Sequence, residues 1–379
     1  MSNEVVITAY DLITAYGCGI EVCWQGLLSR QTAIRRCERF FTGNFQTNNA
    51  ATIPLFDERK TSEDSLLIQI LRMLIGEAGA NIPKDSRLMF ASTAGEIDVL
   101  EEAVIAKNSE VQDSYPGCLL AKVKDLCRLS GPALYVSAAC ASSTAAVAQA
   151  AMMIESGLTD CVLVAAGDIV SEFVFAGFSS LMALSPDVAR PFDRNRNGLS
   201  IGEAAGYALL MSKERALREE RNILGEVSGW GLTSDANHMT GPSRDGEGLA
   251  EAIRKALRKA GKPIEAVGSI AAHGTGTLYN DAMEMKAFQK VFGERKLPAY
   301  SVKGAIGHTL GAAGLVEMII GLKSLAEGMV PPTVNLIDVD AEAEGMVSAT
   351  ALPMDSLTTV SVNAGFGGIN AALVITKIL

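Results

Sequence analysis

The apolar residues of this chain fall into short continuous runs and into longer segments with helical spacing. Short apolar runs bounded by glycine or polar residues predict buried β-strands. Such runs occupy residues 5–7, 133–136, 161–166, 269–272, 297–302, 359–363 and 371–376. Apolar residues three and four apart predict amphipathic helices over residues 63–78, 248–260 and 281–292, and polar stretches predict loops at residues 41–62, 185–198 and 235–246.

Two further predicted helices contain almost no charge. One spans residues 141–156, follows the strand at 133–136 and ends at Gly157. The other spans residues 308–325, follows the strand at 297–302 and ends near Gly328. Helices so poor in charge must be buried on most sides. One such strand–turn–helix segment in each half of the chain predicts a duplicated α/β layout.

Composition supports this layered fold. The chain has 379 residues, enough for two ordinary domains or one large α/β domain, and 48% of them are hydrophobic while only 6% are aromatic. The core must therefore be built from aliphatic and small side chains. The formal net charge of −10 and the lack of any Lys/Arg cluster argue against nucleic-acid binding.

Two more features concern the compartment. No apolar run approaches the roughly 18–20 residues that span a bilayer, and the first residues lack the basic start of a signal peptide. We therefore expect no membrane association and a cytoplasmic protein. Seven cysteines at irregular spacing, with no C-x-x-C, argue against a disulfide framework and against a thiolate zinc site.

Candidate chemistry lies at three strand–helix junctions. Cys140 stands between a predicted strand and the first turn of a buried helix, where backbone N–H groups can lower a thiol pKa and produce a nucleophile. His273 and His308 lie in similar glycine-rich junctions, at residues 273–277 and 307–311. A zinc site built from these three residues and a Cys–His hydrolase are competing interpretations.

Lys303 enters the same apolar junction as His308. A lysine there requires a carboxylate partner, and Glu284 or Asp281 in the helix after the His273 loop could supply it. The glycine-rich turn at residues 363–370 lacks the spacing of a nucleotide-binding loop. We therefore expect no bound cofactor and no structural metal.

Four segments together resemble the β-ketoacyl-acyl-carrier-protein synthases, in particular the elongating type with a Cys-His-His triad and a lysine. They are Val-Ser-Ala-Ala-Cys-Ala-Ser-Ser at residues 136–143, His-Gly-Thr-Gly-Thr at 273–277, Lys-Gly-Ala-Ile-Gly-His-Thr-Leu-Gly-Ala-Ala-Gly at 303–314 and Gly-Phe-Gly-Gly-Ile-Asn at 365–370. The resemblance covers residues 5–376. It implies a thiolase-like fold, a duplicated five-layer α-β-α-β-α sandwich that is usually dimeric. The expected division is a half over residues 1–225 with cap insertions and a half over residues 226–379.

The resemblance also implies roles for the catalytic residues. Cys140 would receive an acyl chain from a carrier's phosphopantetheine arm. His273 and His308 would bind the thioester oxygen of the malonyl carrier during decarboxylation. The backbone N–H groups of Cys140 and Phe366 would form an oxyanion hole, with Phe366 acting as a gate. Both steps place negative charge on oxygen, which preorganised donors stabilise.

The remaining implied residues support the site. Lys303, paired with Glu284, would hold the two histidines electrostatically, and Thr275 and Thr277 would contact the pantetheine. The phosphopantetheine belongs to the substrate, so no resident cofactor is implied.

Several stretches depart from the family's usual pattern. Residues 41–63 and 110–130 are shorter than usual, and Ala204 stands where the family usually has glycine. These departures leave open the chain length, the starter unit and the choice between a housekeeping fatty-acid pathway and a polyketide or polyene pathway. Starter-condensing and thiolase-like enzymes use a different catalytic set, and a non-catalytic chain-length subunit would lack the nucleophile.

The implied partners are an acyl carrier protein and a second subunit, in a homodimer or in a heterodimer with a related chain-length subunit. Carrier proteins are acidic and this chain is itself acidic, so docking requires a local basic patch. The candidate docking residues are Arg59, Lys60, Lys124 and Arg128, with Arg35 and Arg36 as weaker candidates.

Overall fold

The computed structural model describes residues 4–57, 64–76, 81–107 and 114–378. Its main sheet consists of two halves, one from the N-terminal and one from the C-terminal part of the chain. The N-terminal half contains β1 (Val5–Thr14), β5 (Arg87–Ala91), β6 (Ala133–Val136), β7 (Cys161–Asp168) and β9 (Ala204–Ser212). The C-terminal half contains β10 (Gly225–Ser234), β11 (Val267–Ala271), β12 (Ala299–Tyr300), β15 (Thr358–Gly365) and β16 (Ile369–Thr376). The two halves are joined by the antiparallel pairing of β1 with β10.

Both halves have the same strand order. The N-terminal half runs β6-β5-β7-β9-β1, and the C-terminal half runs β12-β11-β15-β16-β10. In each half the first three strands are parallel and the fourth is antiparallel to both of its neighbours. The duplicated α/β layout predicted from the two strand–turn–helix segments is therefore confirmed.

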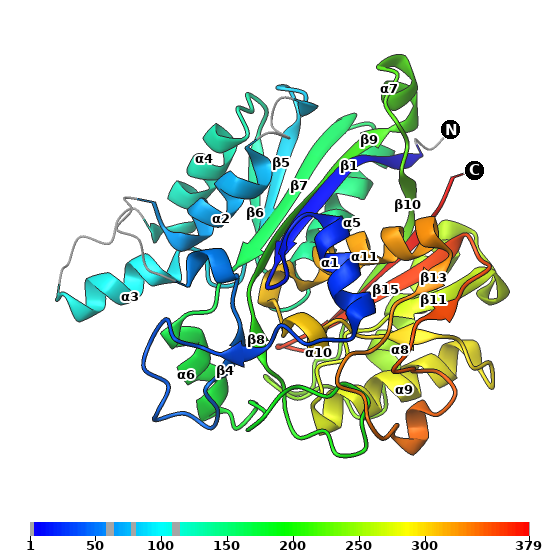
Figure 1. The fold of residues 1–379 in the computed structure, drawn as a ribbon. Coiled ribbons are helices and arrows are strands. Elements are labelled where there is room, and N and C mark those ends of the chain that lie inside the picture. Colours follow the sequence, from blue (N-terminus) through cyan, green and yellow to red (C-terminus); the bar gives the residue numbers. More distant parts are fainter. Residues whose placement is uncertain (1–3, 58–63, 77–80, 108–113, 379) are drawn as a thin grey trace.

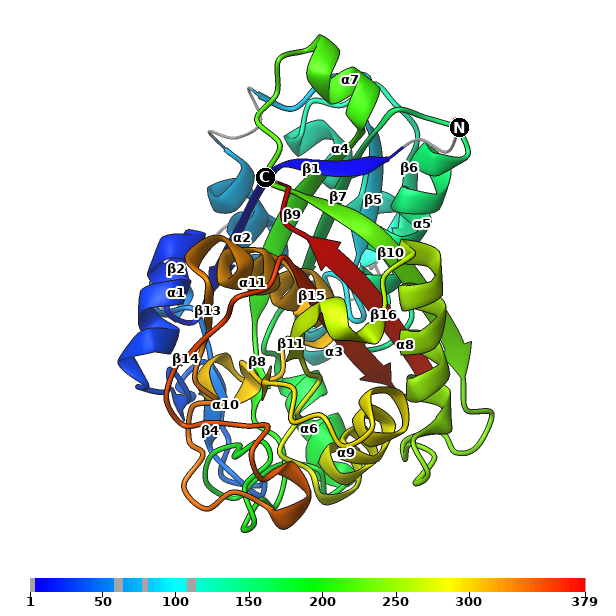
Figure 2. The same cartoon turned by 90° about the vertical axis from the view of Figure 1, so that its right-hand side faces the viewer.

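Helices on both faces of each half of the sheet complete a five-layer arrangement (Figures 1 and 2). The helices α5 (Ser142–Glu155) and α11 (Ala313–Glu327) pack on each other between the two halves, and each contacts strands of both. The helices α2 (Leu66–Ile75) and α4 (Pro116–Leu126) cover the outer face of the N-terminal half, while α8 (Glu247–Ala260) and α9 (Leu278–Phe292) cover that of the C-terminal half. The predicted α-β-α-β-α sandwich is confirmed. No helix among the described residues is long and apolar enough to cross a membrane.

Shorter elements cap this core, and most were not predicted. The helices are α1 (Ile20–Ser29), α3 (Ile97–Ile105), α6 (Glu172–Ser180), α7 (Lys213–Arg218) and α10 (Lys303–Ile306). The short strands are β2 (Gly17–Cys18), β3 (Arg35–Arg36), β4 (Asn49–Ala51), β8 (Ile201–Gly202), β13 (Met329–Val330) and β14 (Leu352–Pro353). The elements β4, β8 and α6 lie below the sandwich in Figure 1. Among them, β8 pairs with the backbone of His308.

Several predicted elements differ from the structure. The strand expected at residues 5–7 continues to Thr14, the one expected at 297–302 is reduced to Ala299–Tyr300, and the loop expected at 41–62 contains β4. The strand at 133–136 was expected to be buried, but β6 is an edge of the main sheet and Leu134 is 47% exposed. The helix expected from residue 308 begins only at Ala313, after a 3₁₀ turn over Leu310–Ala312. Leu310 has φ 53°, and this left-handed conformation interrupts a regular helix. His308 therefore lies in a loop that leads into the helix.

Candidate active site

Cys140 lies in the tight turn between β6 and α5. Ala139, directly before it, has φ 49°, a left-handed conformation that non-glycine residues rarely adopt. The Ser142 hydroxyl stabilises the turn, because its oxygen accepts the backbone N–H of Ala138 at 2.8 Å and donates to the carbonyl of Ala139. The turn places the thiol between α5 and the segments from the C-terminal half that carry the histidines. A buried sulfur in a strained strand–helix turn is typical of a nucleophile.

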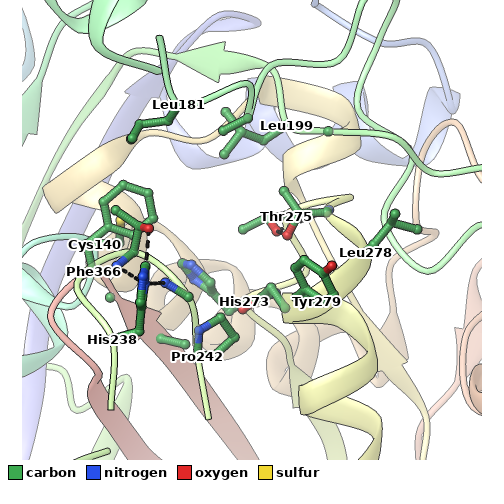
Figure 3. Close-up of a pocket in the computed structure, with 18 of the residues that line it drawn as sticks. Cys140, Leu181, Leu199, His238, Pro242, His273, Thr275, Leu278, Tyr279 and Phe366 are labelled. Carbon is green, nitrogen blue, oxygen red and sulfur yellow. Dashed lines mark hydrogen bonds between the residues drawn. The ribbon is translucent and has the colours of Figure 1, made fainter. Parts of the chain in front are cut away.

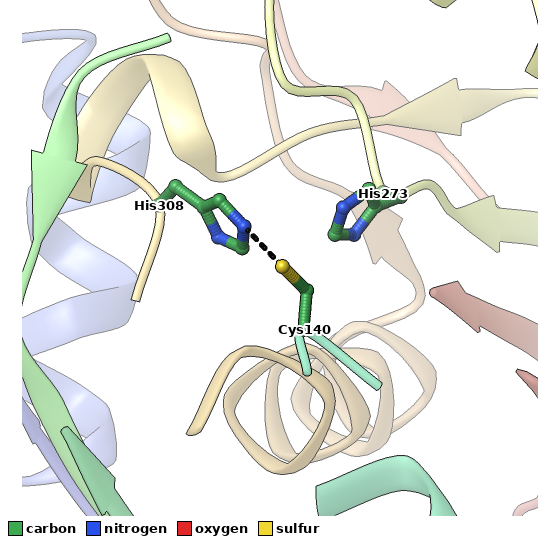
Figure 4. Close-up of side chains that lie close together, drawn as sticks. All are labelled: Cys140, His273 and His308. Carbon is green, nitrogen blue, oxygen red and sulfur yellow. Dashed lines mark hydrogen bonds between the residues drawn. The ribbon is translucent and has the colours of Figure 1, made fainter. Parts of the chain in front are cut away.

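Both histidines reach this sulfur from the other half of the chain (Figure 4). Nε2 of His308 lies 3.0 Å from Sγ of Cys140. The His308 backbone pairs with β8, since its N–H donates to the carbonyl of Ser200 and its carbonyl accepts from Gly202. His273 follows β11, and its ring centre lies 5.2 Å from that of His308 at an interplanar angle of 88°. The three side chains predicted from separate motifs are therefore brought together.

The partner predicted for Lys303 is wrong. The Lys303 ammonium pairs with Glu317 of α11, not with Glu284 or Asp281, and both members of the pair are buried. Glu284 instead accepts the backbone N–H groups of His273 and Gly274, each at 2.7 Å. Glu284 therefore stabilises the backbone of the histidine loop rather than the lysine.

Asp281 has a similar supporting role in the same loop. Its carboxylate accepts the backbone N–H groups of Thr275, Gly276 and Phe192 at 2.8 to 3.2 Å. The Arg196 guanidinium lies 3.8 Å from it. Glu284 and Asp281 thus both lie near the site as predicted, but their carboxylates accept hydrogen bonds from backbone N–H groups and do not pair with Lys303.

Asn363, at the end of β15, completes the lysine network and was not predicted. Its amide nitrogen lies 2.7 Å from Glu317 and 3.2 Å from Nδ1 of His273, and Nζ of Lys303 lies 3.3 Å from the same Nδ1. The lysine and the amide nitrogen are both donors, so Nδ1 of His273 accepts and its proton must be on Nε2.

His308 also favours the tautomer with its proton on Nε2. Among the described residues, Nδ1 of His308 is buried without a hydrogen-bond partner, and an orphaned donor there would be costly. The proton is better placed on Nε2, which faces Cys140. Burial and the positive charge of Lys303 lower the pKa of both His273 and His308 well below the usual value. Two neutral imidazoles thus present Nε2–H groups to the same small space.

The Cys140 thiol is not activated in the way that its position before a helix predicts. Burial raises the pKa of Cys140 to about 11, although the charge of Lys303 and the backbone N–H of Phe366 act in the opposite direction. The expectation of a lowered thiol pKa is therefore wrong. The backbone N–H groups of Phe366 and Cys140 both act to lower the pKa of this thiol.

A further buried carboxylate, Asp168 at the end of β7, was also missed. It accepts the backbone N–H of Gly311 at 2.7 Å and that of Thr93 at 2.9 Å. This contact joins the N-terminal half to the segment that follows His308. By binding the backbone of Gly311, Asp168 therefore helps to fix the position of His308 relative to Cys140.

The site opens into a cavity of about 940 Å³ (Figure 3). Thr275 and Thr277 line it, with their hydroxyl oxygens 2.8 Å apart. Phe366 lies beside Cys140, and its ring packs against that of Phe178 at 5.6 Å between centres. The cavity is therefore lined by polar side chains on the Thr275 side and by aromatic rings beside the sulfur.

A metal ion has three possible ligands here. One ligand atom each from Cys140, His273 and His308 lies within 4.8 Å of the others. The ammonium of Lys303, 3.3 Å from Nδ1 of His273, would repel a divalent cation. The donor set suits zinc, but its electrostatic surroundings do not.

Those docking candidates that the structure describes lie away from the cavity lining. Arg59 and Lys60 lie outside the described residues. Lys124 is in α4 and Arg128 directly follows it, on the outer face of the N-terminal half. Arg35 is in β3 and pairs with Asp57. None of the described candidates is among the residues that line the cavity.

Models of two protein families match the chain. The Beta-ketoacyl synthase N-terminal domain matches residues 88–216, and the Beta-ketoacyl synthase C-terminal domain matches residues 224–337. The first match contains Cys140, and the second contains His273, Lys303 and His308.

Similar proteins cover the chain from end to end. It is 32% identical to the 3-oxoacyl-[acyl-carrier-protein] synthase 2 of Vibrio cholerae, over 99% of each chain. It is 35% identical to Nodulation protein E of Rhizobium meliloti, over 100% of each chain. Among solved structures, the ishigamide ketosynthase/chain length factor superposes with a TM-score of 0.91 at 32% identity, and the match covers 100% of both chains.

Proposed function

This chain belongs to the β-ketoacyl synthase family, and from that premise we propose how its residues perform the reaction. It is a 3-oxoacyl-[acyl-carrier-protein] synthase, an acyltransferase that forms carbon–carbon bonds in fatty-acid or type II polyketide biosynthesis. The observation that supports our mechanism best is the 3.0 Å approach of His308 to Cys140, with His273 facing the same space.

In the first step Cys140 receives the acyl group. Sγ attacks the thioester carbonyl of an acyl carrier. The oxyanion that forms accepts hydrogen bonds from the backbone N–H groups of Cys140 and Phe366. Nε2–H of His308 stabilises the developing thiolate. The proton lost by Cys140 leaves with the carrier thiol, which leaves the acyl group as a thioester on Cys140.

In the second step the two histidines act on the malonyl carrier. Nε2–H of His273 and Nε2–H of His308 donate to the thioester oxygen as carbon dioxide departs and an enolate forms. Because each neutral imidazole already carries its proton on Nε2, both donate to the enolate oxygen without first taking up a proton. Their preorganisation is the main source of stabilisation in this step.

In the third step the enolate carbon attacks the acyl thioester on Cys140. The new oxyanion returns to the N–H groups of Cys140 and Phe366 and collapses to the β-ketoacyl carrier. The Cys140 thiolate departs and takes a proton from solvent. Thr275 and Thr277 hold the pantetheine of each carrier along the cavity wall.

Lys303 is a positioning residue in this scheme. Together with Asn363 it keeps Nδ1 of His273 in the acceptor form, so that Nε2 carries the proton needed for decarboxylation. Glu317 holds the ammonium in place. This network distinguishes the site from the catalytic sets of starter-condensing and thiolase-like enzymes, and the presence of Cys140 argues against a non-catalytic chain-length subunit.

We propose two partners. The first is an acyl carrier protein, which supplies both thioesters on its phosphopantetheine arm. The second is another subunit that pairs with the open edge of β6, where Leu134 is exposed. A second copy of this chain would give a homodimer. A related chain-length subunit would give a heterodimer like the ishigamide ketosynthase/chain length factor.

Product analysis tests this function. The purified chain, alone or with a co-expressed related subunit, is mixed with an acyl carrier and a malonyl carrier, and the products are identified by mass spectrometry. We expect a β-ketoacyl carrier longer by two carbons and loss of carbon dioxide. The Cys140→Ala variant should form no product. Condensation that survives in this variant would exclude Cys140 as the acyl acceptor.

A further inference from the structure

The rim of the cavity carries a positive charge that the three steps do not use. Arg244, in the loop between β10 and α8, lines the same cavity as Cys140. Its guanidinium carbon lies 4.5 Å from the ring centre of Tyr279, at the start of α9. Stacking on an aromatic ring orients a guanidinium without neutralising its charge.

The acidic residues nearest in sequence have other partners. The Asp245 carboxylate accepts from the Ser243 hydroxyl at 2.9 Å and from the backbone N–H of Glu247 at 3.1 Å. Glu247 pairs with Arg254 and with Lys290, each at 2.7 Å. In the described part of the chain, no carboxylate lies within ion-pair distance of Arg244.

A second cation strengthens this local charge. Lys286 of α9 donates from Nζ to the carbonyl oxygen of Arg244 at 3.2 Å, which also stabilises the loop backbone. Arg244 and Lys286 thus outweigh Asp245, the one carboxylate among the described residues that line this cavity, in a chain whose formal net charge is −10. An exposed guanidinium, oriented by a ring and available for two parallel hydrogen bonds, is well suited to a phosphate.

The position of Cys140 indicates which phosphate-bearing ligand would reach Arg244. A carrier-borne thioester must place its carbonyl at Cys140, inside the cavity, so the phosphate at the other end of the arm must lie at or beyond the rim. We propose that Arg244, held on Tyr279, binds the phosphate of the phosphopantetheine arm and gives the enzyme its preference for phosphorylated thioesters. This assignment rests on the proposed function, because it takes the carrier's arm as the ligand.

Binding of the free arm tests the assignment without relying on turnover. The affinities of 4′-phosphopantetheine and of pantetheine, which lacks the phosphate, are compared by ligand-observed NMR. The wild-type chain should bind the phosphorylated compound about five- to tenfold more tightly, as expected for one partly exposed charged contact. Arg244→Gln should remove this preference and leave pantetheine binding unchanged. Arg218→Gln, which changes an exposed arginine on α7, is the matched control and should retain the preference.

Two results would overturn the assignment. One is equal binding of the two compounds by the wild-type chain, and the other is a phosphate preference that survives in Arg244→Gln. Condensation is measured on the same preparations. A phosphate preference that depends on Arg244 in a protein without condensing activity would overturn the proposed reaction instead, and the phosphate site would stand.

Discussion

The ammonium of Lys303 lies 3.3 Å from Nδ1 of His273, and its counterion is Glu317. The lysine therefore acts on the catalytic histidine directly, as a fixed donor, while a glutamate from α11 holds it in place. Loss of either member leaves a charge in a buried site, which affects both the chemistry and the fold.

Separate variants distinguish these two effects. Lys303→Met and Glu317→Gln should each lower the free energy of unfolding by about 3–5 kcal/mol, the usual cost of an uncompensated buried charge. The double variant should recover much of this loss but should still decarboxylate malonyl carrier poorly, because His273 lacks its donor. Urea unfolding and carbon dioxide release are the measurements. A double variant with normal decarboxylation would show that Lys303 has only a structural role.

The histidines should separate the half-reactions. In His273→Ala or His308→Ala, decarboxylation should fall by about 10²–10³, the usual loss for one oxyanion donor. Some acyl transfer to Cys140 should persist, because its oxyanion is bound by backbone N–H groups. Acyl-enzyme formation is followed by protein mass spectrometry and decarboxylation by carbon dioxide release. Intact condensation in either variant would show that the imidazoles are not the donors.

Alkylation should report the raised pKa of Cys140. Because the pKa is about 11, the thiolate fraction of Cys140 should increase roughly tenfold per pH unit between pH 7 and pH 10. Cys18 is exposed, so iodoacetamide should modify it before Cys140 at pH 7. Peptide mapping at several pH values measures both rates. Fast modification of Cys140 at pH 7 with no further increase would indicate a lowered pKa and support the original expectation.

The purified protein should contain no stoichiometric zinc. The Lys303 charge opposes a cation beside His273, and a thiol with a raised pKa is a poor ligand. Elemental analysis after purification without chelators measures this directly. One zinc ion per chain, lost in His273→Ala, would favour the metal-site interpretation.

Carrier docking through α4 stays a prediction. Lys124→Glu combined with Arg128→Glu should raise the KM for carrier-bound substrate severalfold, and the effect should shrink as salt screens charges over about 8–10 Å. A small pantetheine thioester should be turned over normally, because it has no carrier to dock. Equal loss with both substrates would mean that these two variants damage the fold or the dimer.

Cys140, His273 and His308 could be predicted because each stands in a short glycine- or alanine-rich junction with few other reactive residues nearby. The partner of Lys303 could not, because Glu284 and Glu317 are both buried carboxylates and only the packing of α11 decides which one meets the ammonium. One signal for Glu317 was available: it is the single charged residue in the apolar run at residues 313–322.

The strands were predicted more reliably than the caps. The interior strand β7 and residues 371–376 of β16 are nearly continuous apolar runs, whose burial on both faces is evident from composition alone, whereas β15 mixes valine with threonine and serine. The exposure of β6 depends on its place at the sheet edge, a long-range property that its own four residues do not carry. The helices α3 and α6 pack on each other, and each therefore depends on a partner that lies far away in the sequence.

The close packing of α5 and α11 has a consequence for inheritance. A Cβ on Gly314 would meet the Thr144 hydroxyl at 1.8 Å, so the half that carries the nucleophile and the half that carries the proton donors are fixed at one contact. Cys140 makes no part of that contact. A descendant chain could therefore lose its sulfur and keep its shape, whereas a bulkier residue at position 314 would separate the two halves of the site even with every reactive group still encoded.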